Sequence, residues 1–351
     1  MKLAIVNFYQ DQNLRGGETF VEALKNNLSS KVDSVIYSAK SENFPLPPAR
    51  SILHHRHPLR YLFLDLPKIY EFLFTLKIIP KILRRKPDLI MPCNSGWQAL
   101  ILSILTKIAG SKLVISGQSG PGWDDRWNLF IKPDLFVALT KFNQTWAEKV
   151  ALWQTKIVYI PNGVDTKIFK PTGPKLQVKL QGKIIICVAS SSPVKRIDLT
   201  IEAVSKLKDT SLLLVGGGEL KDRIDRLALK KLGEKRFLHL SFPHSQIPKL
   251  LRAADLFTMV SETSESFGIV YLEALACGLG IVTRDDLSRR EIIGDAGLFV
   301  KNPEDPAEYS SALKKALDID WKTKSIARTK NYLWSNIASD YENCFVGLVS
   351  L

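Results

Sequence analysis

Residues 255–278 read DLFTMVSETSESFGIVYLEALACG, and this stretch combines three local signals in a fixed order. A short apolar run that ends near Val260 predicts a buried strand, and a loop rich in Ser, Thr and Glu follows it. Gly268 then opens an apolar segment that stops at Gly278, where a glycine commonly ends a helix. The stretch therefore predicts a strand, a polar loop and a helix whose first turn lies near the end of the strand.

The start of this predicted helix is a candidate anion site. The backbone N–H groups of Gly268, Ile269 and Val270 have no acceptor within the helix, and the helix dipole adds partial positive charge. The dipole contributes about 0.3–1 kcal/mol at an exposed helix end, which is too little to hold a phosphate alone. We therefore expect a basic side chain from another segment to join these amides.

Two carboxylates flank the helix start, Glu265 in the loop and Glu273 in the second turn. Carboxylates accept hydrogen bonds from vicinal hydroxyls, so the pair suits a ligand with a sugar at each end of a phosphate, such as a nucleotide sugar. The spacing by itself favours the ordinary alternative. In that alternative Glu273 is a solvated helix residue and Glu265 interacts only with the helix dipole.

The rest of the 351-residue chain repeats this alternation of strand and helix in two series. Such a pattern predicts βαβ units around parallel sheets. The turn PNG at 161–163 and the proline-containing stretch to residue 174 separate the two series. We therefore expect an α/β protein of two doubly wound, Rossmann-like domains facing a central cleft. The predicted domains are residues 1–165 and 166–333, with a final helix over 334–351 that packs back on the first.

The apolar runs place the strands of both series. The first series has expected strands at residues 3–8, 35–37, 89–92, 113–116, 135–139 and 157–160. The second series has expected strands at residues 184–188, 212–215, 238–240, 256–260 and 280–282.

The chain is strongly basic, with 49 Lys and Arg against 35 Asp and Glu and a formal net charge of +14 at pH 7. This excess predicts an anionic partner, which is nucleic acid, a membrane surface or a phosphate-bearing substrate. No nucleic-acid recognition motif is present, so we expect no nucleic-acid partner. The four cysteines lie far apart, and the sequence contains no signal-peptide core and no apolar span of bilayer length. We expect a cytoplasmic protein, with peripheral contact to the inner face of the membrane as an open alternative.

Residues 50–86 hold nine basic residues against two acids, and five aromatic residues are interleaved with them. A basic, aromatic-rich amphipathic segment suits the face of an anionic membrane, where each Lys or Arg contributes about 1 kcal/mol. The alternative is an ordinary helix with its apolar stripe in the core and its cations solvated. Both interpretations stay open, and the first would fit a lipid-linked acceptor.

Six segments together resemble the motifs of glycosyltransferase family 4, whose members are retaining glycosyltransferases of the GT-B fold. The segments are RGGET at 15–19, PNGVD at 161–165, KRIDLTIEAV at 195–204, LLLVGGGEL at 212–220, ESFGIVYLEALACG at 265–278 and EIIGDAGLFV at 291–300. The resemblance implies an enzyme that needs no cofactor and no metal. It would move a sugar, with retention, from a UDP-, GDP- or other nucleoside diphosphate sugar to a hydroxyl of a glycan or lipid-linked acceptor, in the synthesis of cell-envelope polysaccharides.

The resemblance also implies roles for individual residues. Lys195 would neutralise the donor diphosphate, Glu265 would hold the donor sugar, and Glu273 would hold the ribose. Lys195 and Glu265 are the candidate catalytic residues. Gly16 and Gly17 would form a turn that lets the backbone approach the phosphate and the acceptor. The candidate donor-binding residues are Gly16, Gly17, Ser190, Lys195, Glu265, Phe267, Gly268, Ile269, Val270 and Glu273.

Two positions depart from the family pattern. Ser190 stands where the family usually has an arginine, five residues before the lysine, and Gln118 stands where many members have a histidine. Gln118 and Trp123 are candidate acceptor-binding residues, although Trp123 would equally suit a buried core position. The departures leave a second hypothesis open, which is a catalytically weak nucleotide-sugar-binding or membrane-associated scaffold.

Three other features suggest different chemistry. Gly216-Gly217-Gly218 is typical of dinucleotide binding only if a glycine follows at 221, where Lys221 stands. The cluster His54-His55-Arg56-His57 and the pairs Asp124-Asp125 and Asp285-Asp286 could hold a metal, but none forms a recognised ligand motif. We therefore predict neither a dinucleotide cofactor nor a metal.

Overall fold

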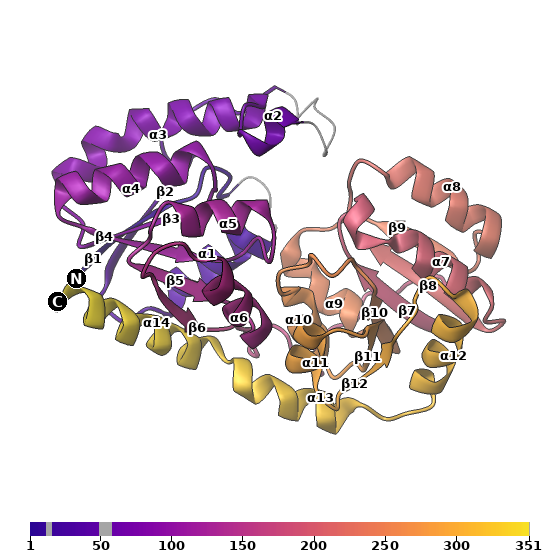
Figure 1. The fold of residues 1–351 in the computed structure, drawn as a ribbon. Helices are drawn as coiled ribbons and strands as arrows, with labels where there is room; N and C mark the ends of the chain where they lie inside the picture. The colour runs from indigo at the N-terminus through magenta and orange to yellow at the C-terminus, as the bar shows by residue number, and fades with distance from the viewer. Residues whose placement is uncertain (12–15, 49–57, 351) are drawn as a thin grey trace. The chain divides into compact units, whose positions relative to one another are not determined.

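The computed structural model describes residues 1–11, 16–48 and 58–350, and the chain divides into two compact units. Unit 1 consists of Met1–Asn162 and Trp334–Leu351, and unit 2 consists of Gly163–Leu333. Each unit is a parallel β-sheet with helices on its faces (Figure 1).

Unit 1 is built on six parallel strands in the order β2-β1-β3-β4-β5-β6. The order runs outward from β1 in both directions, which is the doubly wound arrangement. Leu3, Ala4 and Ile5 of β1 are completely buried, as expected for a parallel strand covered on both faces. The strands are β1 (Lys2–Val6), β2 (Asp33–Tyr37), β3 (Leu89–Pro92), β4 (Lys112–Ser116), β5 (Leu135–Ala138) and β6 (Lys156–Tyr159).

The long helix α3 covers one part of this sheet. Its residues Phe74, Ile78 and Ile82 are completely buried, and the Phe74 ring packs edge-on against Phe8 and Phe44 at 5.2 and 5.6 Å between ring centroids. The helices of unit 1 are α1 (Gly16–Asn27), α2 (Pro58–Tyr61), α3 (Leu66–Arg85), α4 (Trp97–Ala109), α5 (Trp123–Phe130), α6 (Lys141–Val150) and α14 (Trp334–Val349).

Helix α14, the last element of the chain, packs against α1 in unit 1. The ring of Phe20 lies 5.9 Å from that of Tyr341 and 6.1 Å from that of Trp334. The Tyr341 hydroxyl also lies 3.0 Å from the hydroxyl of Ser116 at the end of β4. The final helix is therefore part of the core of unit 1.

Unit 2 repeats the architecture with six parallel strands in the order β12-β11-β10-β7-β8-β9. Its strands are β7 (Lys183–Val188), β8 (Thr210–Val215), β9 (Phe237–Leu240), β10 (Leu256–Met259), β11 (Ile281–Arg284) and β12 (Gly297–Val300). Its α-helices are α7 (Ile197–Ser205), α8 (Lys221–Leu232), α9 (Ile247–Leu251), α10 (Ile269–Ala276), α11 (Leu287–Ile293), α12 (Pro306–Leu317) and α13 (Lys322–Thr329). Three 3-10 turns complete it: η1 (Pro193–Lys195), η2 (His244–Gln246) and η3 (Lys330–Tyr332).

The expectation of two doubly wound, Rossmann-like α/β domains is confirmed. Each predicted strand is present, with ends shifted by no more than two residues. Strand β12 and helices α2, α5, α11 and α13 lie in segments for which the sequence predicted no such element. No helix in the described ranges is long and apolar enough to cross a bilayer.

The packing of α14 leads to a prediction about stability, and the next residue in the helix provides its control. Phe345 is completely buried, whereas Val346 is 57% exposed. We expect Phe345→Ala to lower the free energy of unfolding by about 3–5 kcal/mol, because it leaves a cavity in the core of unit 1. Val346→Ala should change it by less than about 0.5 kcal/mol. Urea unfolding followed by circular dichroism measures both, and equal losses would contradict this placement of α14.

Candidate functional site

The predicted anion site is formed by the first turn of α10, and its geometry depends on Gly268. This residue has φ of 77°, in the left-handed region that favours glycine. A Cβ atom there would also lie 2.7 Å from the ring of Tyr271. The amide of Tyr271 donates to the Gly268 carbonyl at 2.9 Å, so the amides of Gly268, Ile269 and Val270 have no acceptor within the helix.

A buried arginine that the sequence analysis missed fixes the loop before this helix. Arg289 is 3% exposed, and its Nη2 donates to the carbonyl oxygens of Ser261 and Glu262 at 2.9 and 3.0 Å. Its Nε donates to the Tyr271 hydroxyl at 3.2 Å, and that hydroxyl in turn donates to the Met259 carbonyl at 2.9 Å. The end of β10, the loop and the first turn of α10 are therefore held together by one guanidinium and one phenol.

Lys195 and Glu265, which lie far apart in the sequence, form an ion pair in unit 2. The Nζ of Lys195 lies 2.5 Å from Oε2 of Glu265, and the two side chains are 20% and 16% exposed. The backbone supports this approach, because the Glu262 amide donates to the Val194 carbonyl at 2.8 Å. A basic side chain from another segment thus joins the loop that leads into α10.

Glu273 is buried rather than solvated, being 5% exposed. Its Oε1 lies 2.6 Å from Nε2 of His244, whose ring centroid is 5.4 Å from that of Phe169. The sequence analysis gave His244 no role. A buried carboxylate that keeps a polar partner is costly to displace, so this pair fixes the position of Glu273.

Two other predicted donor-binding residues, Phe267 and Ser190, are not placed as side chains that simply contact a ligand. The Phe267 side chain is 3% exposed and packs edge-on against Tyr332 at 6.3 Å, so only its backbone is available to a ligand. Ser190 is exposed, and its hydroxyl lies 3.4 Å from that of Ser192. The position that holds an arginine in the family therefore offers a neutral hydroxyl to solvent.

The run of three glycines after β8, residues 216–218, allows close packing against the segment that follows β7. A Cβ atom at Gly216 would lie 2.1 Å from the Ala189 carbonyl oxygen, and one at Gly218 would lie 2.6 Å from that of Ser191. The Ser191 amide donates to the Gly217 carbonyl at 2.9 Å. The run thus fixes the segment that leads to Lys195.

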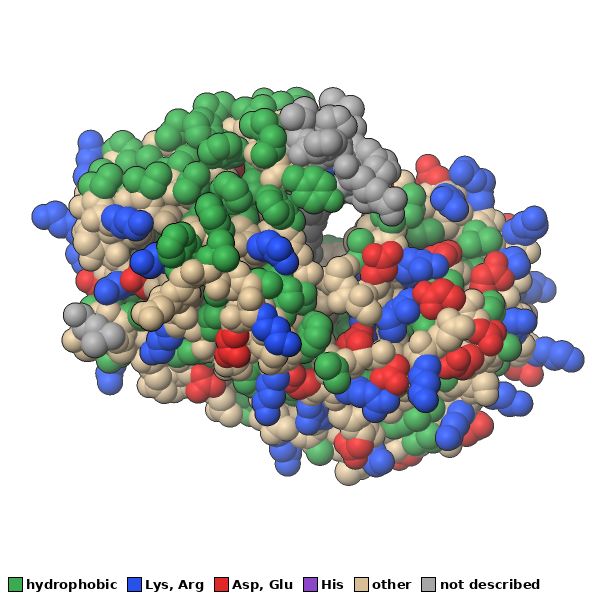
Figure 2. All heavy atoms as spheres, viewed as in Figure 1, with side chains coloured by type: hydrophobic (Ala, Val, Ile, Leu, Met, Phe, Trp, Pro, Cys, Tyr) green, Lys and Arg blue, Asp and Glu red, His purple; other side chains and the backbone are tan. Residues whose placement is uncertain are grey.

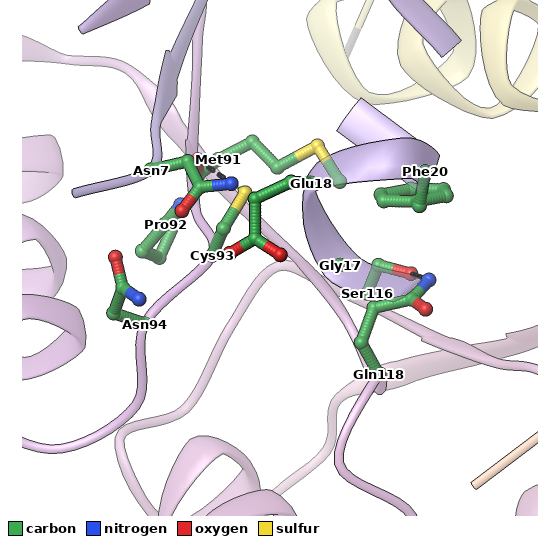
Figure 3. Close-up of a pocket in the computed structure, with 10 residues that line it drawn as sticks. All are labelled: Asn7, Gly17, Glu18, Phe20, Met91, Pro92, Cys93, Asn94, Ser116 and Gln118. Atoms are coloured by element: carbon green, nitrogen blue, oxygen red, sulfur yellow. Dashed lines mark hydrogen bonds between the residues drawn. The ribbon is translucent and has the colours of Figure 1, made fainter. Parts of the chain in front are cut away.

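In unit 1 a pocket lies at the carboxyl ends of the central strands (Figure 3). Gly17, Glu18 and Gln118 are among its lining residues, and Glu18 is 7% exposed. Gly16 and Gly17 begin helix α1 rather than forming a separate turn. The pocket also contains Cys93, whose thiol has its pKa raised by burial, so it carries no thiolate at neutral pH.

Gln118 is tied into a hydrogen-bond network within unit 1. Its Nε2 donates to Asn162 Oδ1 at 3.1 Å, and Asn162 Nδ2 donates back to Gln118 Oε1 at 3.1 Å. Its Nε2 also donates to the Ser116 hydroxyl at 2.9 Å. The amide therefore has a fixed orientation at the pocket wall, but it cannot take up a proton as a histidine could.

Trp123 is neither buried nor among the described residues that line this pocket. Its side chain is 42% exposed, and its indole N–H donates to the Tyr61 carbonyl at 2.7 Å. Within the described ranges no three His, Cys, Asp or Glu residues come together as a metal-ligand group. The cluster of His54, His55 and His57 lies outside the described residues.

Comparison with known proteins extends this description. Residues 171–332 match the family model described as "Glycosyl transferases group 1". A phosphatidylinositol N-acetylglucosaminyltransferase chain of Arabidopsis thaliana is 28% identical over 299 residues, which cover 79% of this chain and 65% of that protein. A GDP-mannose-dependent monoacylated alpha-(1-6)-phosphatidylinositol monomannoside mannosyltransferase of Corynebacterium glutamicum is 30% identical over 178 residues, or 46% of each chain. The chain thus spans less than two thirds of the length of either relative.

The crystal structure of Anabaena HepE in complex with UDP and glucose superposes with a TM-score of 0.75 at 16% identity, over 99% of this chain and 100% of that one. The two parallel six-stranded sheets with their interleaved helices are therefore those of the GT-B class, as the sequence predicted. The match to the glycosyl transferases group 1 model lies wholly within unit 2 of the chain.

The buried carboxyl of Asp125 makes a prediction about pH. Burial raises its pKa to about 7, although it accepts hydrogen bonds from the Gly120 amide at 2.9 Å and the Asn128 amide at 3.1 Å. Above its ordinary pKa of about 4, the unfolded chain has lost a proton that the folded protein still holds. The free energy of unfolding should therefore fall by about 2–4 kcal/mol as pH rises from about 4 to about 7.

Asp125→Asn should remove most of this dependence. The Asn128 side-chain oxygen has no hydrogen-bond partner among the described residues, so an amide flip lets it accept from the new side chain. Thermal melts at pH 5 and pH 8 measure the effect. Asp124→Asn, which removes a neighbouring charge that also raises the Asp125 pKa, should weaken the dependence without abolishing it.

Proposed function

We propose that this chain is a retaining, metal-independent glycosyltransferase that moves a sugar from a nucleoside diphosphate sugar to a hydroxyl of a lipid-linked or glycan acceptor. The ion pair between Lys195 and Glu265 is the observation that carries the proposal. Glu265 lies in the loop before α10, three residues before Gly268. A cation, helix-start amides and carboxylates together match a diphosphate with a sugar at each end.

The donor roles follow from these groups. The amides of Gly268, Ile269 and Val270 and the ammonium of Lys195 bind the diphosphate. Glu265 accepts hydrogen bonds from the hydroxyls of the transferred sugar. Glu273, which is held by His244 at 2.6 Å, accepts those of the ribose.

Donor binding requires the Lys195–Glu265 pair to exchange partners. The ammonium moves to the phosphate oxygens, and the carboxylate moves to the sugar hydroxyls. The exchange replaces one charge-assisted contact by two, so neither of these largely buried groups is left without a partner. The ion pair thus keeps the loop ordered before the donor arrives.

The proposed chemistry needs no protein base at position 118. The bond between the anomeric carbon and the diphosphate oxygen breaks on the same face on which the acceptor oxygen bonds to that carbon. The acceptor proton passes to the departing phosphate oxygen, and Lys195 with the helix-start amides stabilises the charge on that phosphate. The neutral amide of Gln118 orients the acceptor rather than removing its proton.

The names of both relatives include phosphatidylinositol, which supports a lipid-linked acceptor. One of these relatives is dependent on GDP-mannose and the HepE structure holds UDP, so donors of both bases are candidates. The pocket of unit 1, with Glu18 and Gln118 in its wall, is the proposed acceptor site.

A catalytically weak nucleotide-sugar-binding scaffold is the second candidate. The exposed hydroxyl of Ser190 favours it, because one cation of the family site is absent from that position. Release of UDP or GDP from a panel of donors, measured with and without phosphatidylinositol, separates the two. Donor binding with no release for any donor would support the scaffold and contradict the enzyme.

Removal of the Lys195 ammonium should reduce turnover by about 10²–10³-fold, the usual cost of losing one group that stabilises transition-state charge. Lys195→Ala is compared with Lys231→Ala, which breaks an exposed ion pair to Glu202 in the same unit and should leave turnover unchanged. Nucleoside diphosphate release is measured with EDTA present throughout, because the proposal requires no metal. Full wild-type activity in Lys195→Ala would contradict the assigned role.

Gly17 provides a test that separates ligand approach from folding. A Cβ atom at Gly17 would have nothing within 4 Å among the described residues, so the fold does not require glycine there. We expect Gly17→Ala to keep or raise thermal stability, since alanine favours a helix by about 1 kcal/mol, yet to lower kcat/KM by about tenfold or more. Gly347→Ala, at an equally open glycine of α14, is the control and should leave kcat/KM unchanged.

A further inference from the structure

Helix α3 has an apolar outer side that the fold does not use. Its inner side, with Phe74, Ile78 and Ile82, is completely buried in unit 1. Ile69, Leu73 and Leu76 follow one another at helical spacing, and their side chains are 44%, 47% and 44% exposed. A helix that is apolar on two sides needs a second partner, and the described part of unit 1 does not supply one.

The apolar surface continues onto the neighbouring helices. Helix α4 packs beside α3 and presents Ile104 and Ile108, which are 53% and 74% exposed, and α5 ends in Phe130, which is 51% exposed. Figure 2 shows hydrophobic side chains gathered over the region where Figure 1 places α3 and α4. We name this surface the outer face of unit 1 and define it by Ile69, Leu73, Leu76, Ile104, Ile108 and Phe130.

A continuous chain of aromatic contacts joins the parts of the outer face. The ring of Trp97 lies 6.5 Å from both Phe72 of α3 and Trp127 of α5, and Trp127 lies 6.0 Å from Phe130. The indole N–H of Trp153, which is 48% exposed, donates to the Phe130 carbonyl at 3.0 Å. The tryptophan side chain combines a polar N–H with an apolar ring, and exposed tryptophans are typical of proteins that contact the bilayer–water interface.

The charged side chains of α3 and α4, around the outer face, are almost all positive. Helices α3 and α4 contain a single acidic residue, Glu71, which is 2% exposed and paired with Lys68 at 2.8 Å. Lys107 lies between Ile104 and Ile108 in the sequence, and Lys132 Nζ lies 5.7 Å from the ring centroid of Trp153. A second copy of this face would bring cations against cations, whereas anionic lipid headgroups complement it.

Several cations of residues 50–86 are already engaged within unit 1. Lys68 pairs with Glu71, Lys81 pairs with Glu42, and Arg85 Nη2 lies 2.6 Å from Asp33. Less of the segment's charge is therefore available to lipids than its composition indicates. We therefore expect apolar contact, which salt does not screen, to contribute more to lipid binding by this surface than charge does.

We propose that the outer face of unit 1 inserts its apolar side chains into the interfacial layer of an anionic lipid bilayer. The exposed apolar side chains supply most of the binding, and the surrounding cations select anionic lipid. No helix in the described ranges could span a bilayer, so the contact is interfacial. The inference does not depend on the proposed catalysis, and its test needs no turnover.

The test is flotation of the full chain with vesicles of phosphatidylcholine and phosphatidylglycerol (7:3) or phosphatidylcholine alone. We expect recovery with the anionic vesicles, weaker recovery with the neutral ones, and retention at 500 mM NaCl. Leu73→Ser/Ile108→Ser should lower the partition coefficient at least tenfold without altering the charge, because it removes inserted methylene groups. Leu229→Ser/Leu287→Ser is the matched control, since these leucines of unit 2 are 45% and 66% exposed, and it should bind as wild type does.

Three outcomes would overturn the proposal. The first is absence of recovery with both vesicle compositions. The second is binding that disappears at 500 mM NaCl and is equally strong in Leu73→Ser/Ile108→Ser and the control, which would leave only electrostatic attraction. The third is a wild-type protein that does not bind vesicles and that light scattering shows to be a dimer, which Leu73→Ser/Ile108→Ser converts to a monomer. That result would make the outer face a self-association surface.

Discussion

The turn at Gly268 is the constraint on which the candidate donor site depends. Its left-handed backbone directs the chain from the loop into α10, and the Tyr271 ring beneath it occupies the space that any side chain at 268 would need. Tyr271 is in turn held by Arg289 and by the Met259 carbonyl. The helix-start amides are therefore positioned by a rigid frame before any ligand binds.

Much of the fold was predictable because the signals are local. Strands such as β7 and β10 are short runs of consecutive apolar residues, and burial on both faces of a parallel sheet requires such runs. Helix α5 was missed because its sequence, WDDRWNLF, places Asp125 and Asn128 on the buried side, where a hydrophobic pattern gives no signal. Buried polar residues thus account for the omission of α5.

The candidate site was predictable only in part. The helix start and the need for a cation follow from residues 255–278, but the choice of Lys195 came from the family resemblance. The partnership of His244 with Glu273 has no local signal, because the two residues lie in different elements and meet only after folding. The same is true of Arg289, which satisfies backbone carbonyls that the sequence does not reveal. Likewise, the charge count over 50–86 could not show which cations are paired inside unit 1.

The membership of α14 in unit 1 has a consequence for the order of folding during synthesis. All the strands and helices of unit 2 lie within one continuous stretch of chain, so this unit can complete its core before α14 has emerged from the ribosome. Unit 1 lacks the partners of Phe20 until Trp334 and Tyr341 have emerged from the ribosome. The half of the molecule that is synthesised first is therefore the half that matures last, and its nascent form exposes the aromatic side chains that α14 later covers.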